Sequence, residues 1–168
     1  MLEPADVQEA LEFVKRAFDL SEQFDTPVVL RSTTRLCHTR SLVRTGERLE
    51  REPVGFLEDP QKNVMIPANA RRRHPKLLER MNALKQHFDD PEWSRLEKGD
   101  PKFGVVTVGP VYTYVKEVLP GATILKLSSS FPMPEKTLRE FCESMDRVFV
   151  VEELEPVIET AMQSIGFV

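Results

Sequence analysis

The chain has 168 residues, of which 40% are hydrophobic and 30% charged, and its formal net charge is -4. This composition is typical of a soluble globular protein with one domain, or one domain and part of another. The negative charge argues against a dedicated nucleic-acid binder, and no apolar run approaches the roughly 20 residues of a membrane span. The N-terminus lacks the pattern of a secretion signal and the two cysteines lie far apart, so we expect a cytoplasmic protein.

The first predicted unit, residues 1–45, is a helix followed by a strand. Apolar residues recur every three or four positions in residues 5–22, as in an amphipathic helix. The predicted inward face consists of Val7, Leu11, Val14, Ala17 and Phe18. The run VVLRSTT, residues 28–34, is predicted to be a strand with a polar end. A lone helix and strand cannot bury their apolar surfaces, so this unit needs neighbours from the rest of the chain, another chain or a larger parent protein.

Residues 46–100 are predicted to be a connector that contains a helix. Residues 68–88 have an apolar face at helical spacing, and Pro75 is expected to kink this helix or to start a new one. The basic cluster Arg71–Arg73 allows two interpretations, a phosphate or nucleic-acid contact, or a solvated face or one paired with acidic surface. The second is the more common use of such a charge run.

Residues 101–168 alternate between apolar strands and helices. The continuous apolar run FGVVTVG (103–109) indicates a strand buried on both faces, and Pro110 suits the start of the next helix. A strand with a polar loop (122–134), a helix (135–145), a strand (147–155) and a last helix (156–166) follow. This order predicts an α/β fold in three layers, a parallel sheet with helices on both faces.

The carboxyl ends of the predicted strands are candidate ligand positions, because open α/β sheets bind ligands there. The turn after residue 108 has a single glycine, so it is neither a dinucleotide fingerprint nor a P-loop. Glu152 or Glu153 could serve as a general acid or base, but no histidine or nucleophile is placed to complete such a site. A contact of these residues across an interface is therefore favoured over catalysis. Cys37 beside His38 is expected to be a packed cysteine, since neighbours in a strand point to opposite faces. The sequence thus predicts no catalytic and no metal-binding residue.

Four stretches of the chain carry a resemblance to a known family. They are DVQEALEFVKRAFDLSEQFDTPVVLRSTTRLCHTRS, NVMIPANARRRH, TYVKEVLPGATILKLSSSFPMP and VVEELEPVIE. In this order they resemble the 2-oxoacid:ferredoxin oxidoreductase family, and within it the alpha subunits that act on indolepyruvate. The resemblance implies a parent enzyme that oxidatively decarboxylates aryl 2-oxoacids to acyl-CoA. Its implied cofactors are thiamine diphosphate, magnesium and 4Fe-4S clusters, and ferredoxin accepts the electrons.

The resemblance also implies a place for this chain in the parent. Residues 1–45 would end the thiamine-pyrimidine-binding domain, and residues 101–168 would form a transketolase C-terminal-like domain. The implied partners are the remaining domains, a beta subunit, ferredoxin, coenzyme A and the 2-oxoacid. Since the sheet would have a truncated edge, we also expect a homo-oligomer.

The chain has neither a diphosphate and magnesium motif nor clustered cysteines. We therefore expect it to bind none of these cofactors alone, and to serve as an inactive scaffold and interface. Arg35 and His38, at the predicted strand end, are expected to lie near the cofactor cleft of the parent. The alternative is a free-standing, non-catalytic α/β binding or regulatory module.

Overall fold

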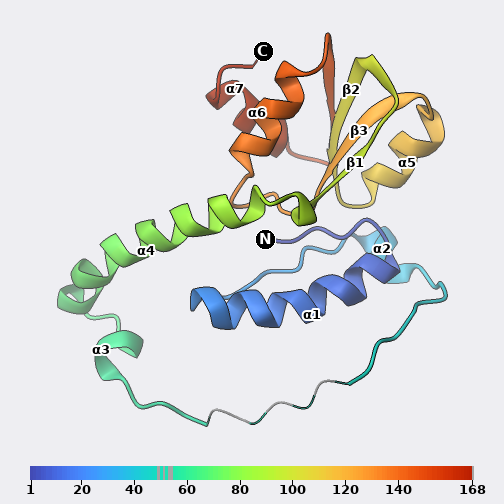
Figure 1. Ribbon diagram of the computed structural model, residues 1–168. Helices are drawn as coiled ribbons and strands as arrows, with labels where there is room; N and C mark the ends of the chain where they lie inside the picture. The colour runs from blue at the N-terminus through green and yellow to red at the C-terminus, as the bar shows by residue number, and fades with distance from the viewer. Residues whose placement is uncertain (49, 51, 53–54, 168) are drawn as a thin grey trace.

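The computed structural model describes residues 1–48, 50, 52 and 55–167. Figure 1 shows a sheet with flanking helices, and two long helices beneath it. The elements in chain order are α1 (Val7–Phe24), α2 (Thr34–His38), α3 (Pro60–Asn63), α4 (Pro67–Phe88), η1 (Pro91–Trp93), β1 (Ser94–Glu97), β2 (Asp100–Val108), α5 (Val111–Val118), β3 (Ala122–Leu127), α6 (Glu135–Glu143), β4 (Val148–Val151) and α7 (Val157–Ser164). Among the described residues, no helix is both long and apolar enough to cross a membrane.

The sheet has four strands in the order β1-β3-β2-β4. Strand β2 pairs in parallel with β3 and β4, as the alternation of strands and helices predicted, but β1 pairs antiparallel with β3. The parallel pairing predicted for residues 101–168 is confirmed, and the antiparallel edge strand β1 is an addition that was not predicted. Only residues 98–99 separate β1 from β2, too few for the crossover that two parallel strands require. The sheet thus includes residues from the segment expected to be connector.

The predicted three-layer architecture is confirmed. Alternate residues of a strand point to opposite faces, so Val105 of β2 packs with α5 whereas Val106 packs with α6 and α7. The two apolar clusters lie on either side of the central strands, where continuous apolar sequence meets helices on both faces.

The predicted inward face of α1 is wrong for Val14 and Phe18, whereas Ala17 of that face does pack against the core. The buried residues of α1 include Phe13 and Leu20, which join Trp93 and the end of α4 in a third apolar cluster. Val14 is 41% exposed and Phe18 is 68% exposed. The face of α1 that packs inside is therefore the one that carries Phe13 and Leu20.

The predicted strand at residues 28–34 is also wrong. Leu30 forms only an isolated bridge with Leu2, and the following residues form helix α2. The hydroxyl of Thr33 accepts a hydrogen bond from the Leu36 N–H (3.3 Å), which is the N-cap arrangement that threonine favours. A local cap therefore outweighs the strand preference of the threonine pair.

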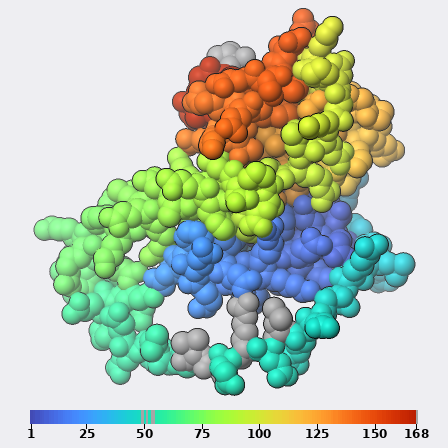
Figure 2. Space-filling view, in the orientation of Figure 1, coloured from blue at the N-terminus to red at the C-terminus, as the bar shows by residue number. Residues whose placement is uncertain are grey.

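Helix α4 continues through Pro75, so the expected new start after His74 is not observed. Its C-terminal end packs through Leu84 and Phe88 into the cluster with α1. Its N-terminal half, together with α3, projects away from the sheet (Figure 1), and the same extension is visible in the space-filling view (Figure 2).

Candidate functional site

Arg35 and His38, the residues expected near a cofactor cleft, lie on the short helix α2. Both side chains are exposed. The guanidinium carbon of Arg35 lies 5.0 Å from the ring centroid of Tyr114, a cation–π contact between α2 and the helix α5 that covers the sheet. The expectation of a packed Cys37 is wrong: Cys37 is exposed on α2, and its Sγ lies 3.4 Å from Ser32 Oγ.

The carboxyl ends of β2 and β3 meet, as expected, but the N-terminal segment covers them. The backbone N–H of Glu3 donates to the Ser128 carbonyl (3.0 Å), and Leu2 bridges Ser129. The Glu3 carboxylate is buried and accepts hydrogen bonds from Arg31 (2.5 Å) and from the Ser130 hydroxyl. The position where ligands bind in open α/β sheets is thus filled by this chain's own buried carboxylate and its partners.

A fully buried lysine, Lys126 on β3, fastens α1 to the sheet. Its ammonium forms an ion pair with the buried carboxylate of Glu9 on α1 and lies 4.9 Å from the ring centroid of Phe13. Burial lowers the pKa of the Lys126 amine, and the Glu9 carboxylate opposes this shift. Sequence analysis missed this pair; its only signal is one lysine within the apolar run ATILKL.

A second polar cluster holds the edge strand β1 against α5. The Tyr112 hydroxyl donates to Glu97, and the Lys116 ammonium lies 2.9 Å from the same carboxylate. These two hydrogen bonds lower the pKa of the Glu97 carboxyl. Arg95 donates to the Tyr112 hydroxyl at 3.4 Å, and this contact raises the pKa of Arg95. The cluster joins two elements and is partly open to solvent.

Glu152, considered above as a general acid or base, caps the last helix instead. Its carboxylate accepts hydrogen bonds from the first backbone N–H groups of α7, those of Val157 (3.0 Å), Ile158 (2.9 Å) and Glu159 (3.1 Å). A carboxylate at this end also complements the helix dipole. The acidic pair after β4 therefore has a structural use, and its capping member is Glu152.

We expect Glu152→Ala to lower the free energy of unfolding by about 1 kcal/mol, because three N–H groups of α7 lose their acceptor. Glu153→Ala is the matched control, since Glu153 is exposed and its replacement should change stability by less than about 0.5 kcal/mol. Urea unfolding followed by circular dichroism measures both. Equal effects of the two substitutions would contradict the capping role.

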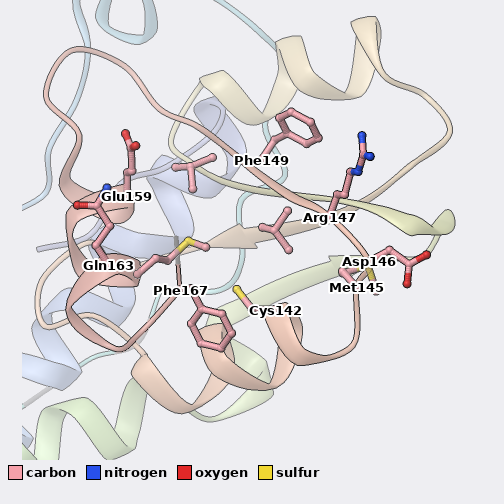
Figure 3. Close-up of a pocket in the computed structure, with 11 residues that line it drawn as sticks. Cys142, Met145, Asp146, Arg147, Phe149, Glu159, Gln163 and Phe167 are labelled. Carbon is pink, nitrogen blue, oxygen red and sulfur yellow. The ribbon is translucent and has the colours of Figure 1, made fainter.

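A cavity of about 550 Å³ opens beside β4, between this strand and the helices α6 and α7 (Figure 3). Cys142, Met162 and Phe167 line it with Val148 and Val150 of the strand. Burial raises the pKa of the Cys142 thiol, which keeps the sulfur protonated and a poor nucleophile. Asp146, Arg147, Glu159 and Gln163 also line it, so the cavity is a hollow of mixed polarity along a strand edge.

The described residues do not fit the cofactors that the family resemblance implies. Within residues 1–48, 50, 52 and 55–167, no three His, Cys, Asp or Glu side chains converge as a metal site would require. The two cysteines are a surface residue and a core residue, Cys37 and Cys142. Neither a magnesium-bound diphosphate nor an iron–sulfur cluster has its ligands here.

Two of the three arginines in the basic cluster Arg71–Arg73 form hydrogen bonds or ion pairs with residues of α3, α4 and the end of α1. Arg73 donates to the Lys62 carbonyl (3.0 Å) and lies 3.9 Å from Asp25, while Arg72 donates to Asn69 (2.6 Å). Two of the three guanidinium groups, those of Arg72 and Arg73, therefore make contacts with α3, with the first turn of α4 and with the end of α1.

Comparison with known proteins shows relatives over nearly the whole chain. No family model matches it. It is 38% identical over 172 residues to the indolepyruvate oxidoreductase subunit IorA of Archaeoglobus fulgidus, and 39% over 173 residues to that of Methanothermobacter thermautotrophicus. Each alignment covers 99% of this chain and 28% of the relative. The 2-oxoglutarate synthase subunit KorA of Archaeoglobus fulgidus is 27% identical over 175 residues, which are 90% of this chain and 49% of that subunit.

Among solved structures, the 2-oxoglutarate:ferredoxin oxidoreductase from Magnetococcus marinus, with 2-oxoglutarate, coenzyme A and succinyl-CoA bound, is similar with a TM-score of 0.47 and 18% identity. That similarity covers 59% of this chain and 18% of the other. The sequence relationship is far more extensive, at 36-39% identity over 99% of the chain for curated relatives. The chain is therefore homologous, over nearly its whole length, to a segment of the indolepyruvate oxidoreductase subunits IorA, and it spans about 28% of their length.

Proposed function

We propose that the chain is one segment of a 2-oxoacid:ferredoxin oxidoreductase alpha subunit. The whole enzyme would oxidatively decarboxylate an aryl 2-oxoacid, indolepyruvate first, to its acyl-CoA, with ferredoxin as electron acceptor. The observation that carries the proposal is the 36-39% identity to subunits named for indolepyruvate. The lower identity to the 2-oxoglutarate synthase subunits, 27% and 23%, favours indolepyruvate over 2-oxoglutarate.

Within that enzyme, the segment would act as scaffold and interface and be inactive alone. Residues 1–45 would close the thiamine-pyrimidine-binding domain, 46–100 would connect, and 101–168 would form the transketolase C-terminal-like domain. In the whole enzyme, thiamine diphosphate would supply the electron sink for decarboxylation, and 4Fe-4S clusters would carry electrons one at a time. Because the described residues lack ligands for magnesium and for clusters, these groups would be held by the remaining domains and a beta subunit, in the cytoplasm.

Exposed α2 would then face the cofactor cleft that the remaining domains complete. Arg35 and His38 are its candidate residues, because both are exposed and Arg35 lies over the ring of Tyr114. Neither residue is assigned a step of the reaction. Their proposed role is to shape the side of the cleft that would hold the cofactor.

The proposal is tested by comparing this chain with the complete enzyme that contains it. We expect no saturable binding of thiamine diphosphate with magnesium to the 168-residue chain by isothermal titration calorimetry. The complete enzyme should bind it and reduce ferredoxin when given indolepyruvate and coenzyme A. In the complete enzyme, Arg35→Ala should raise the concentration of thiamine diphosphate needed for half-maximal activity, while Arg71→Ala should not.

Saturable cofactor binding by the isolated chain would refute its role as an inactive scaffold. Turnover of 2-oxoglutarate without turnover of indolepyruvate would refute the substrate. If the 168-residue chain were functional in the absence of all other oxidoreductase domains and subunits, that result would support the alternative of a free-standing binding module.

A further inference from the structure

Trp93 lies at the junction between the two long helices and the sheet. Its side chain is 3% exposed and packs in the cluster that also contains Phe13 of α1 and Phe88 of α4. Its carbonyl accepts a hydrogen bond from the Ser128 N–H (3.1 Å), just after β3, and the next residue, Ser94, begins β1. A change in the packing of Trp93 therefore affects the contacts of both helices with the sheet.

The indole N–H of Trp93 depends on one histidine. It donates a hydrogen bond to His87 Nε2 (3.0 Å), its only acceptor among the described residues. A ring nitrogen accepts through a free lone pair, so this bond requires a neutral imidazole with its proton on Nδ1. The protonation state of His87 therefore decides whether the buried indole has a hydrogen-bond partner.

The imidazole of His87 lies among three aromatic rings. Its centroid is 5.1 Å from that of Phe24, 5.8 Å from that of Phe88 and 5.4 Å from that of Trp93. These rings belong to α1, α4 and η1, so the imidazole is located where three elements meet. The side chain is half-buried and also lines an open hollow of about 250 Å³, so protons from solvent can reach it.

We propose that His87 is a pH-sensitive switch at this junction. While the imidazole is neutral, Nε2 accepts the Trp93 indole N–H, and the end of α4 stays bonded to the residue that precedes the sheet. When Nε2 takes up a proton from solvent, it becomes a donor, and the buried indole N–H loses its acceptor. The packing of α1 and α4 against Trp93 is then weakened. The inference does not depend on the proposed function, because every group involved lies within this chain.

The direction of the pH effect follows from this hydrogen bond. In the unfolded chain, His87 takes up a proton without losing a contact, whereas in the folded chain it loses its bond to Trp93. The stability that the bond contributes is therefore present at neutral pH and above. It is lost as the pH falls through the range in which histidine side chains commonly titrate, around pH 6.5.

The charged groups that share the hollow with His87 do not reverse this direction. Arg16 of α1 opposes a second cation, since its guanidinium carbon lies 3.8 Å from the centroid of the Trp93 ring. The Glu92 carboxylate of η1 attracts an imidazolium, but it already pairs with Arg16 at 2.7 Å. The Asp19 carboxylate of α1 also attracts it, but Asp19 is exposed, so solvent screens that attraction.

The charged neighbours of His87 along α4 and at its end make contacts elsewhere. Lys85 pairs with Glu135 of α6 at 2.6 Å, and the Asp89 carboxylate accepts a hydrogen bond from the Thr137 N–H (3.0 Å). Asp90 caps η1 by accepting from the Glu92 N–H (3.0 Å). The direct hydrogen bond to Trp93 is therefore the contact that determines how protonation of His87 affects the fold.

Nuclear magnetic resonance tests the proposal in the unmodified chain, which has one tryptophan and three histidines. At about pH 8 we expect the His87 imidazole to carry its proton on Nδ1. The exposed His38 and His74 are internal controls that need not favour this tautomer. On lowering the pH to about 5.5, the Trp93 indole N–H should exchange with solvent at least about 10-fold faster, in step with protonation of His87. A proton on Nε2 at about pH 8, or indole exchange that does not follow His87, would overturn the proposal.

Histidine variants give a second measurement, with His74→Gln as the matched control. Glutamine in place of His87 can accept the indole N–H through its amide oxygen, but it does not titrate. From about pH 8 to about pH 5.5, the melting temperatures of the unmodified chain and of His74→Gln should fall at least about 3 °C further than that of His87→Gln. Equal falls in all three proteins would overturn the proposal. His87→Phe lacks the acceptor at every pH and should melt below His87→Gln at about pH 8; equal melting temperatures would show that the indole needs no acceptor, and would also overturn it.

Discussion

Glu9→Gln is expected to lower the free energy of unfolding by about 3–5 kcal/mol, the usual cost of breaking a buried ion pair. The substitution keeps the side-chain size and an oxygen for the Ala5 N–H, which donates to Glu9 at 2.5 Å. It removes the carboxylate that compensates the fully buried ammonium of Lys126. The amine must then remain charged without a counter-ion or release its proton, and either outcome costs free energy in the folded state.

Urea unfolding of Glu9→Gln, with Glu140→Gln as the control, measures this cost. Glu140 also pairs with a lysine, Lys136 at 3.8 Å, but both side chains are largely exposed. An exposed pair of this kind is worth less than about 0.5 kcal/mol. The double variant Glu9→Leu/Lys126→Met should be more stable than Glu9→Gln, because neither charge is then buried alone. If Glu9→Gln were no more destabilising than Glu140→Gln, the pair would not hold α1 to the sheet.

The Glu9–Lys126 pair shows what the sequence cannot indicate. The run ATILKL predicts a buried strand correctly, and β3 is buried at every position. The partner of its lysine lies 117 residues earlier, in a helix whose acidic residues all look alike in the sequence. Periodicity reports which residues share a face of one element, whereas this contact depends on how two distant elements pack. The same limit applies to the buried Glu3 at the strand ends.

The layers of the sheet could be predicted because each strand–helix unit is signalled locally. Continuous apolar runs and prolines at helix starts mark the strands and helices from residue 103 onward. Strand β1 could not be predicted in the same way, since SRLE is short and only partly buried. The two-residue connection to β2 excludes a parallel crossover and so explains why β1 runs antiparallel, but it does not predict that β1 pairs with β3. The role of Arg35 and His38 stays a prediction, because it depends on domains outside this chain.

The orientation of α1 is the sharpest disagreement between sequence and structure, and two phenylalanines on this helix test it. Phe13→Ala is expected to lower the free energy of unfolding by about 3–5 kcal/mol, because the ring is 97% buried and its removal leaves a cavity. That ring is 3% exposed, lies 6.5 Å from Trp93 and supports the Lys126 ammonium. Phe18→Ala should change the free energy by less than about 0.5 kcal/mol, because Phe18 is 68% exposed.

The single tryptophan of the chain, Trp93, reports both variants by its fluorescence during urea unfolding. Phe13→Ala should also shift the native emission of Trp93 to longer wavelength, because water gains access to the indole, whereas Phe18→Ala should leave it unchanged. The opposite ranking of the two variants would mean that the face inferred from periodicity packs inside. Because the Glu9 carboxylate and Phe13 share one face of α1, that ranking would also mean that Glu9 does not face Lys126 as its counter-ion. The two substitutions and the Glu9 variant therefore test one packing arrangement from its apolar and its charged side.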